Sequence, residues 1–355
     1  MFRRASALLV AAGLALAGCS RTAAKAPAAE AAAGDPSSST GAAAAGDAAA
    51  SADAGPAEGA APESAETAEA LAGKGPFLWR VEGRAPIYLF GTIHVPDERV
   101  LALPPSVLKA FTDSAAVYTE IPMDSATQMG VMGKVMLPDG TQLSEVIGEQ
   151  LYNRMTAAAE KTLGAEHAGL GTMLGPLFQR MKPWAAMSQL SLLEFLPDIL
   201  AGKQPLDAMI YARAQAEGKK VGALETPDEQ IAVFESFSLR EQTRMLELTL
   251  DEIERVKPGG RTQTQELIDA YLSGDMAIVE NVMEEAMSGD RALMARFQDI
   301  AIIRRNNHMT ERILALRTEQ PTTVLFVAVG TAHYAGPTGI VAQLQKAGLE
   351  VTRVP

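Results

Sequence analysis

Apolar residues follow two different patterns along this chain. Short unbroken apolar runs have the length of buried β-strands, and they lie mainly towards the two ends of the region from residue 77 onwards. These runs predict strands at 77–81, 87–90, 115–119, 220–224, 324–329 and 350–354, the first of them as an edge strand.

Elsewhere apolar residues recur every three or four positions, which is typical of helices with one buried face. The predicted helices are 104–111, 143–163, 187–195, 208–216, 241–256, 264–273, 275–287, 291–316 and 339–347. Strands at both ends with helices between them indicate an α/β fold with a small mixed central sheet. The helical insertion covers about 126–315 and is interrupted by a core strand near 219–225.

Two of the predicted strands run into the same four-residue motif. Residues 87–90 are followed by Gly91-Thr92-Ile93-His94, and residues 324–329 are followed by Gly330-Thr331-Ala332-His333. We expect each glycine to let the backbone turn tightly after its strand. One half of the chain has the order strand-GTxH, helix, strand-Glu, and the other has strand-Glu, helices, strand-GTxH. This order predicts two pseudo-symmetric halves.

Four polar side chains follow the predicted strands: His94, Glu120, Glu225 and His333. In α/β sheets ligands bind at the carboxyl ends of the strands, so we expect these four residues to converge on one cleft. Two imidazoles and two carboxylates suit a divalent metal such as Mn, Co, Fe or Zn, with a position open for water. One carboxylate could instead act as a general base.

Other roles remain open for these and neighbouring residues. A histidine after a strand can be a buried core residue, and a glutamate there can form a salt bridge or cap a helix. Asp124, Asp207 and Arg305 are candidate neighbours of the site, although we favour a solvated or structural ion pair for each. We expect His167 and His308 to be surface residues.

The N-terminus has the features of a secretory signal. Arg3 and Arg4 precede a short apolar stretch at 5–17, and small residues lead to Cys19, the single cysteine. This pattern predicts a signal peptide at 1–18, cleavage before Cys19 and acylation of its thiol, a palmitate-type anchor in the bilayer. A buried thiol or a nucleophile is the disfavoured alternative for Cys19. Ser20 resembles the sorting signal of Gram-negative outer-membrane lipoproteins, which implies a periplasm-facing location.

Composition separates a tether from a folded domain. Residues 20–75 are mostly Ala, Gly, Ser, Pro and acidic residues, which bury too little apolar surface to fold. We therefore predict a lipidated, disordered tether at 19–75 and one folded domain at 76–355. The formal net charge of −12 argues against a nucleic-acid partner.

The motifs together resemble the TraB/GumN family. Besides both GTxH motifs, the resemblance rests on short segments through the folded part: Leu137-Pro138-Asp139-Gly140-Thr141, Lys182-Pro183-Trp184, Pro205-Leu206-Asp207, Leu224-Glu225-Thr226 with Gln230, Arg305-Asn306 and Gly336. The family includes the TIKI metalloproteases and belongs to a wider group with haem-binding ChaN lipoproteins and erythromycin esterases.

The resemblance implies a membrane-anchored, metal-dependent hydrolase that acts as a peptidase on peptides or proteins. It assigns the metal and catalytic roles to His94, Glu120 and His333, and it matches Glu225 and Arg305 to family positions. The alternative is a lipoprotein that binds haem, metal or peptide without turnover. The substrate, the metal and the oligomeric state are left open.

Overall fold

The computed structural model describes residues 75–355, apart from 165–166, 258 and 287–288. The predicted signal peptide, the acylated Cys19 and almost all of the predicted tether lie outside the described residues. Within the described ranges, no helix combines the length and the apolar character needed to cross a bilayer.

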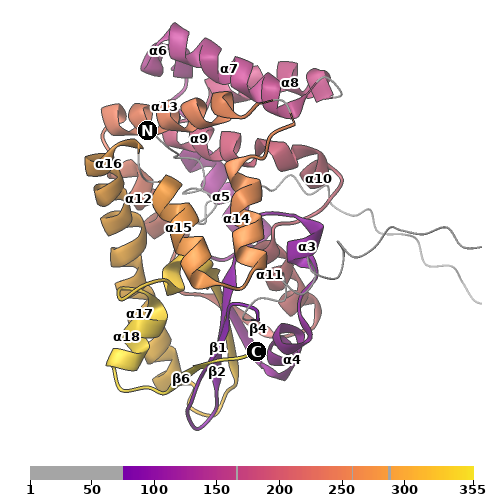
Figure 1. The fold of residues 1–355 in the computed structure, drawn as a ribbon, viewed down its shortest axis with the longest axis vertical. Coiled ribbons are helices and arrows are strands. Elements are labelled where there is room, and N and C mark those ends of the chain that lie inside the picture. The colour runs from indigo at the N-terminus through magenta and orange to yellow at the C-terminus, as the bar shows by residue number, and fades with distance from the viewer. Residues whose placement is uncertain (1–74, 165–166, 258, 287–288) are drawn as a thin grey trace, which may run out of the picture. The chain divides into compact units, whose positions relative to one another are not determined.

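A single mixed sheet forms the centre of the described part (Figure 1). Its strands are β1 (Leu78–Val81), β2 (Ile87–Thr92), β3 (Ala116–Thr119), β4 (Lys220–Ala223), β5 (Leu325–Gly330) and β6 (Val351–Arg353). Their order across the sheet is β4-β3-β5-β2-β1-β6. The first four strands in this order pair in parallel, whereas β1 pairs antiparallel with β2 and β6. The predicted α/β class with a mixed sheet is therefore confirmed.

The prediction that residues 77–81 form an edge strand is wrong. β1 lies between β2 and β6, so the edges of the sheet are β4 and β6. β6 pairs along the outer side of β1, with Arg353 opposite Trp79. The guanidinium of Arg353 lies 4.6 Å from the Phe77 ring centre and 4.5 Å from that of Trp79, a cation–π arrangement that favours this pairing.

Helices cover both faces of the sheet. In Figure 1, α4 (Pro105–Asp113) and α11 (Leu206–Ala216) lie on one side, and α17 (Arg304–Glu319) and α18 (Ile340–Lys346) on the other. Their apolar residues join those of the strands in one hydrophobic cluster. For example, Phe111 of α4 meets Phe326 of β5 edge-on at 5.6 Å between ring centres. Three further helices contribute to this cluster or border it: α3 (Glu98–Leu101), α14 (Gln263–Leu272) and α15 (Met276–Ala286).

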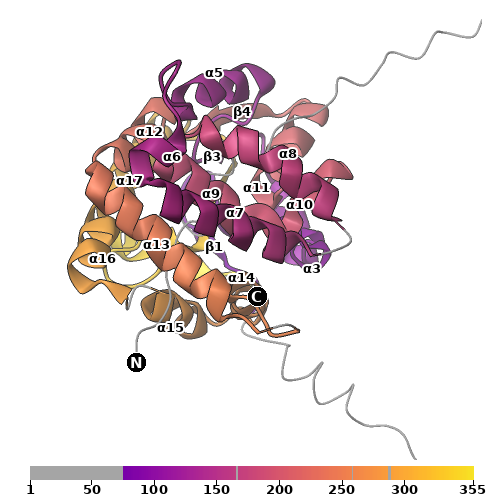
Figure 2. The same ribbon diagram turned by 90° about the horizontal axis from the view of Figure 1, so that it is seen from above.

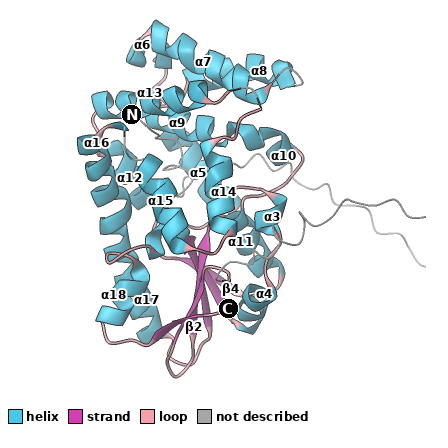
Figure 3. Ribbon diagram, in the orientation of Figure 1, coloured by secondary structure: helices cyan, strands magenta, loops and turns pink. Residues whose placement is uncertain are grey.

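A second hydrophobic cluster lies among the remaining helices, above the sheet in Figure 3 and seen from above in Figure 2. Trp184 is fully buried in it and stacks on Phe234 at 5.0 Å, as expected for its apolar surroundings. These elements are α5 (Ser125–Val135), α6 (Leu143–Ile147), α7 (Glu149–Leu163), α8 (Ala168–Gln179), α9 (Pro183–Leu192), η2 (Leu193–Phe195), α10 (Leu196–Leu200), α12 (Pro227–Glu235), α13 (Leu239–Arg255) and α16 (Arg291–Phe297).

Two predicted helices are interrupted for local reasons. The helix expected at 143–163 is two helices, because Gly148 between α6 and α7 has a φ of 87°, which ends the first helix. The helix expected at 291–316 contains a π-helical turn, η4 (Gln298–Ile303), between α16 and α17. Such turns are rare and often lie at functional sites. Here the turn ends at Ile303, two residues before Arg305.

The glycines of the GTxH motifs do not act as tight turns. Gly91 is still part of β2, Gly330 ends β5, and neither has a positive φ. Gly91 is needed for space instead: a Cβ at this position would lie 2.7 Å from Thr331 Oγ1 and 2.8 Å from Phe77 Cβ. The expectation of a turn is therefore wrong, because both glycines still lie in strands. Gly91 instead leaves room for the side chains of Thr331 and Phe77.

Gly91→Ala should lower the stability of the fold. The added methyl group overpacks the end of β2, at a cost of about 1–3 kcal/mol in the free energy of unfolding. The matched control is Gly133→Ala on the exposed side of α5, where a Cβ meets nothing within 4 Å and alanine favours the helix. Chemical denaturation of both variants checks this, and equal stability of Gly91→Ala and the parent would contradict it.

Candidate functional site

Four neighbouring parallel strands each deliver one polar residue to the same edge of the sheet. His94 follows β2, Glu120 follows β3, Glu225 follows β4, and His333 lies in η5 (Thr331–Tyr334) after β5. All four side chains are buried. The structure therefore brings the predicted residues together at the carboxyl ends of the strands.

Glu120 lies at the centre of the cluster. Its Oε1 accepts a hydrogen bond from the backbone N–H of Gly330 at 2.8 Å. The same oxygen lies 3.8 Å from His94 Nε2 and 4.0 Å from His333 Nε2. Its Oε2 accepts from Gln230 Nε2 at 2.9 Å and from Arg305 Nη2 at 2.5 Å. One carboxylate thus lies among residues of β5, η5, α12 and α17 and the segment that follows β2.

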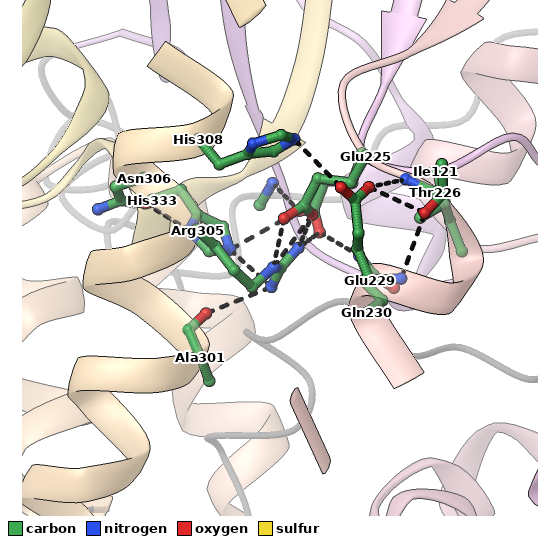
Figure 4. Close-up of polar contacts among 12 residues, drawn as sticks. Ile121, Glu225, Thr226, Glu229, Gln230, Ala301, Arg305, Asn306, His308 and His333 are labelled. Atoms are coloured by element: carbon green, nitrogen blue, oxygen red, sulfur yellow. Dashed lines mark hydrogen bonds and ion pairs between the residues drawn. The ribbon is translucent and has the colours of Figure 1, made fainter. Parts of the chain in front are cut away.

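Arg305 is the cation of the cluster and is only 5% exposed (Figure 4). Besides Glu120, its Nε and Nη2 bind Glu225, with Nη2 at 2.6 Å from Oε2. Its Nη1 donates to the carbonyl of Ala301 at 3.3 Å, which lies within the π-helical turn, and faces His333 Nε2 at 3.2 Å. A single guanidinium therefore compensates two buried carboxylates. The ion pair favoured from the sequence exists, but it is buried rather than solvated.

His94 and Asp207 form a pair of unsatisfied groups. His94 Nδ1 lies 3.0 Å from Asp207 Oδ2 on α11, without hydrogen-bond geometry. Among the described residues, neither ring nitrogen of His94 and neither carboxylate oxygen of Asp207 has a hydrogen-bond partner. Buried polar atoms without partners are costly and rare. The nitrogens of His94 and the carboxylate oxygens of Asp207 can therefore bind an added ligand.

Two residues in contact with the cluster carried no predicted role. Asn306 Oδ1 lies 2.6 Å from His333 Nδ1, and Gln230 binds Glu120. Both residues belong to motifs in the sequence, but their type alone does not indicate a contact between segments so far apart. Asp124, in contrast, caps α5 by accepting from the N–H of Thr127, so it has a structural role. His308 is exposed as predicted, and it lies 3.7 Å from Glu229.

The same environment shifts the pKa values of the cluster in different directions. Burial alone would raise the pKa of Glu120, but Arg305, the two imidazoles and the Gly330 N–H lower it to about 2. Burial raises the pKa of Glu225 despite Arg305, because Glu225 has fewer stabilising partners. Burial and Arg305 together lower the pKa of His333 to about 3. Burial would lower the pKa of His94, but Asp207 and Glu120 outweigh it and raise that pKa.

The donor chemistry of the cluster fits a divalent cation. Ligands at about 2.0–2.2 Å from one ion can be up to roughly 4 Å apart, which matches the separations of both Nε2 atoms from Glu120 Oε1. The unsatisfied atoms of His94 and Asp207 also favour a cation there. As it stands, no set of three or more His, Cys, Asp or Glu residues in the described part is close enough to hold an ion. The Arg305 guanidinium occupies the contacts of Glu120 and His333 instead.

Comparison with known proteins shows which family the described part of the chain resembles. The model of the TraB/PrgY/gumN family matches residues 77–353. Metalloprotease TIKI2 of Xenopus tropicalis is 30% identical over 314 residues, which cover 79% of this chain and 60% of that protein. Metalloprotease TIKI1 of Danio rerio is 28% identical over 83% of this chain and 66% of its own length. The chain thus spans less than two thirds of these relatives. No solved structure matches this chain significantly.

The metal-free protein should lose stability in acid through Glu120. Its pKa is about 2 in the folded state against an ordinary value of 4.5, so its contribution is complete above pH 4.5 and is lost as the pH falls towards 2. A shift of this size corresponds to roughly 3 kcal/mol. Glu120→Gln should flatten the pH dependence of the unfolding free energy in this window, measured with a chelator present. Asp139→Asn, at a fully exposed side chain, is the control and should keep the parent slope.

Proposed function

Because the chain belongs to the TraB/PrgY/gumN family, we propose that it is a metal-dependent hydrolase that cleaves peptide bonds in extracytoplasmic peptides or proteins. Its metalloprotease relatives support a metal-dependent, peptidase-like function. The observation that carries the proposal is the convergence of His94 and His333 on one carboxylate oxygen of Glu120.

In this proposal the two imidazoles and Glu120 hold a divalent metal such as Mn, Co, Fe or Zn. When bound, such an ion polarises the scissile carbonyl and lowers the pKa of a bound water. The three hydrogen bonds that hold Glu120 keep its carboxylate charged and fixed, which suits a ligand better than a proton acceptor. Asp207 Oδ2 lies 3.0 Å from Nδ1 of His94, the ring nitrogen that does not face Glu120.

Glu225 is the better proton acceptor of the two glutamates. Its pKa is raised by burial, so it takes up a proton more readily than Glu120 does. Arg305 links the two carboxylates through one nitrogen, Nη2, which places them next to each other. We therefore assign the Glu225 carboxylate as the group that accepts the proton of the attacking water.

The burial of the cluster favours a second candidate function. Glu120 and His94 are each 2% exposed, and His333 is fully buried. A peptide carbonyl can reach them only if the surrounding helices move apart. A protein that binds a metal without turning over substrate needs no such opening. This second candidate predicts metal binding without peptide hydrolysis.

Location is part of the proposal and depends on residues outside the described part. We propose that Cys19 is acylated and that the chain is an outer-membrane lipoprotein facing the periplasm. The charged, apolar and small-residue regions of the N-terminus support this.

Removing either ligand histidine should release the metal. His94→Ala and His333→Ala should each lower the metal content of the purified protein and abolish peptide hydrolysis, because among the described residues no other histidine lies in the cluster. His167→Ala is the matched control, since His167 lies at the start of α8 and contacts the Leu163 carbonyl. Metal analysis beside a peptidase assay gives both quantities.

The glutamates separate the roles within the same assays. Glu225→Gln should keep the metal and lower the rate of hydrolysis by about 10²- to 10⁴-fold, whereas Glu120→Gln should also weaken metal binding. Metal bound by the parent without any hydrolysis would support the second candidate. Full hydrolysis in the double variant His94→Ala, His333→Ala would refute both the site and the mechanism.

The anchor can be tested apart from the chemistry. Cys19→Ser should prevent incorporation of labelled fatty acid, because the thiol that receives the lipid is absent. Ser20→Ala is the matched control and should remain labelled and in the outer-membrane fraction. Label in the Cys19→Ser protein would overturn the proposed anchor and leave the proposed catalytic site unaffected.

A further inference from the structure

His333 is held on both sides by side chains of two consecutive residues. Arg305 and Asn306 lie in the first turn of α17, which follows the π-helical turn, and both point towards the ring of His333 (Figure 4). Arg305 Nη1 lies 3.2 Å from Nε2, and Asn306 Oδ1 lies 2.6 Å from Nδ1. Asn306 and His333 are both fully buried, so water does not compete for these contacts.

The orientation of the Asn306 amide follows from its second contact. Asn306 Nδ2 lies 2.9 Å from the carbonyl oxygen of Thr338, and a carbonyl oxygen can only accept a hydrogen bond. The nitrogen of the amide must therefore face Thr338, and the oxygen must face His333. Turning the amide over would place two oxygens in contact at one end, which excludes the flipped form.

These contacts determine where the proton of His333 lies. The amide oxygen of Asn306 can only accept, so Nδ1 must carry the proton and donate it. The guanidinium of Arg305 can only donate, so Nε2 must present its lone pair. Two independent neighbours thus require the same tautomer, with Nε2 unprotonated and 4.0 Å from Glu120 Oε1.

We propose that Asn306 is a positioning residue, which fixes the ring of His333 and its tautomer so that Nε2 stays unprotonated at the candidate metal site. The link from Asn306 to metal binding rests on the proposed function, whereas the tautomer itself does not. Metal-binding histidines are commonly oriented through their other ring nitrogen, and loss of such a partner weakens metal affinity by about 10- to 100-fold. Asn306 has this place relative to His333, as Asp207 has relative to His94.

The test uses the full chain with ¹⁵N-labelled histidine, free of metal, and His333→Gln to assign the signals among the four histidines. We expect His333 to show a protonated Nδ1 and an unprotonated Nε2, with the Nδ1 proton far downfield because of its short hydrogen bond. In Asn306→Leu this proton signal should move upfield or be lost to exchange. Asn306→Asp retains an oxygen towards Nδ1 and should keep it downfield.

The chain offers a matched control in the adjacent residue. Asn307 is exposed on the same helix, so Asn307→Leu should leave the His333 signals unchanged. In a titration with Co²⁺, Asn306→Leu should bind about 10- to 100-fold more weakly than the parent, and Asn307→Leu should bind equally well.

Two results would overturn the proposal: a proton on Nε2 of His333 in the parent, or unchanged His333 signals in a folded Asn306→Leu variant. If Asn306→Leu does not fold, the parent spectrum and the Asn306→Asp variant still decide the matter. A parent that binds no Co²⁺ but shows the expected tautomer would refute the proposed metal and support the assigned orientation.

Discussion

The pairing of Arg305 with Glu120 and Glu225 is the interaction on which the rest of the site depends. Two carboxylates at the buried ends of adjacent strands would repel each other without a cation between them, and removing one partner of such a buried group is strongly destabilising. The guanidinium suits this place because its planar fork of donors can reach several acceptors at once. Its position also fixes α17 against the sheet, and with it the contacts of His333.

Alternating donors and acceptors surround His333, whereas acceptors predominate around His94. Arg305 and Asn306 satisfy both nitrogens of His333. His94 instead lies between the carboxylates of Glu120 and Asp207, which offer only acceptors while they are charged. Both ring nitrogens of His333 are therefore satisfied, whereas His94 requires a proton or a cation beside it. This asymmetry indicates that an added positive charge would be held most strongly next to His94.

The sequence predicted the strands and the polar residues at their ends, because an apolar run followed by a charged or imidazole side chain is a local pattern. It did not predict the place of β1, since the pairing of β6 with residues 79–81 decides whether that strand is an edge. The sequence did not predict the role of Asn306 either. Its partners, His333 and the Thr338 carbonyl, come from another segment. The π-helical turn before α17 cannot be recognised from the spacing of apolar residues. The roles predicted for the strand-end residues themselves await the experiments above.

The order of the strands has a consequence for how the molecule is made. β2 and β3 are close in sequence, yet they do not pair, because β5 from near the end of the chain lies between them. A growing chain therefore cannot assemble the centre of this sheet until nearly all of it has been synthesised. Folding that waits for such distant partners is slow, and incomplete chains expose unpaired strand edges. The same late strand brings Gly330 and His333, so a chain that lacks β5 has neither the centre of the sheet nor the complete site.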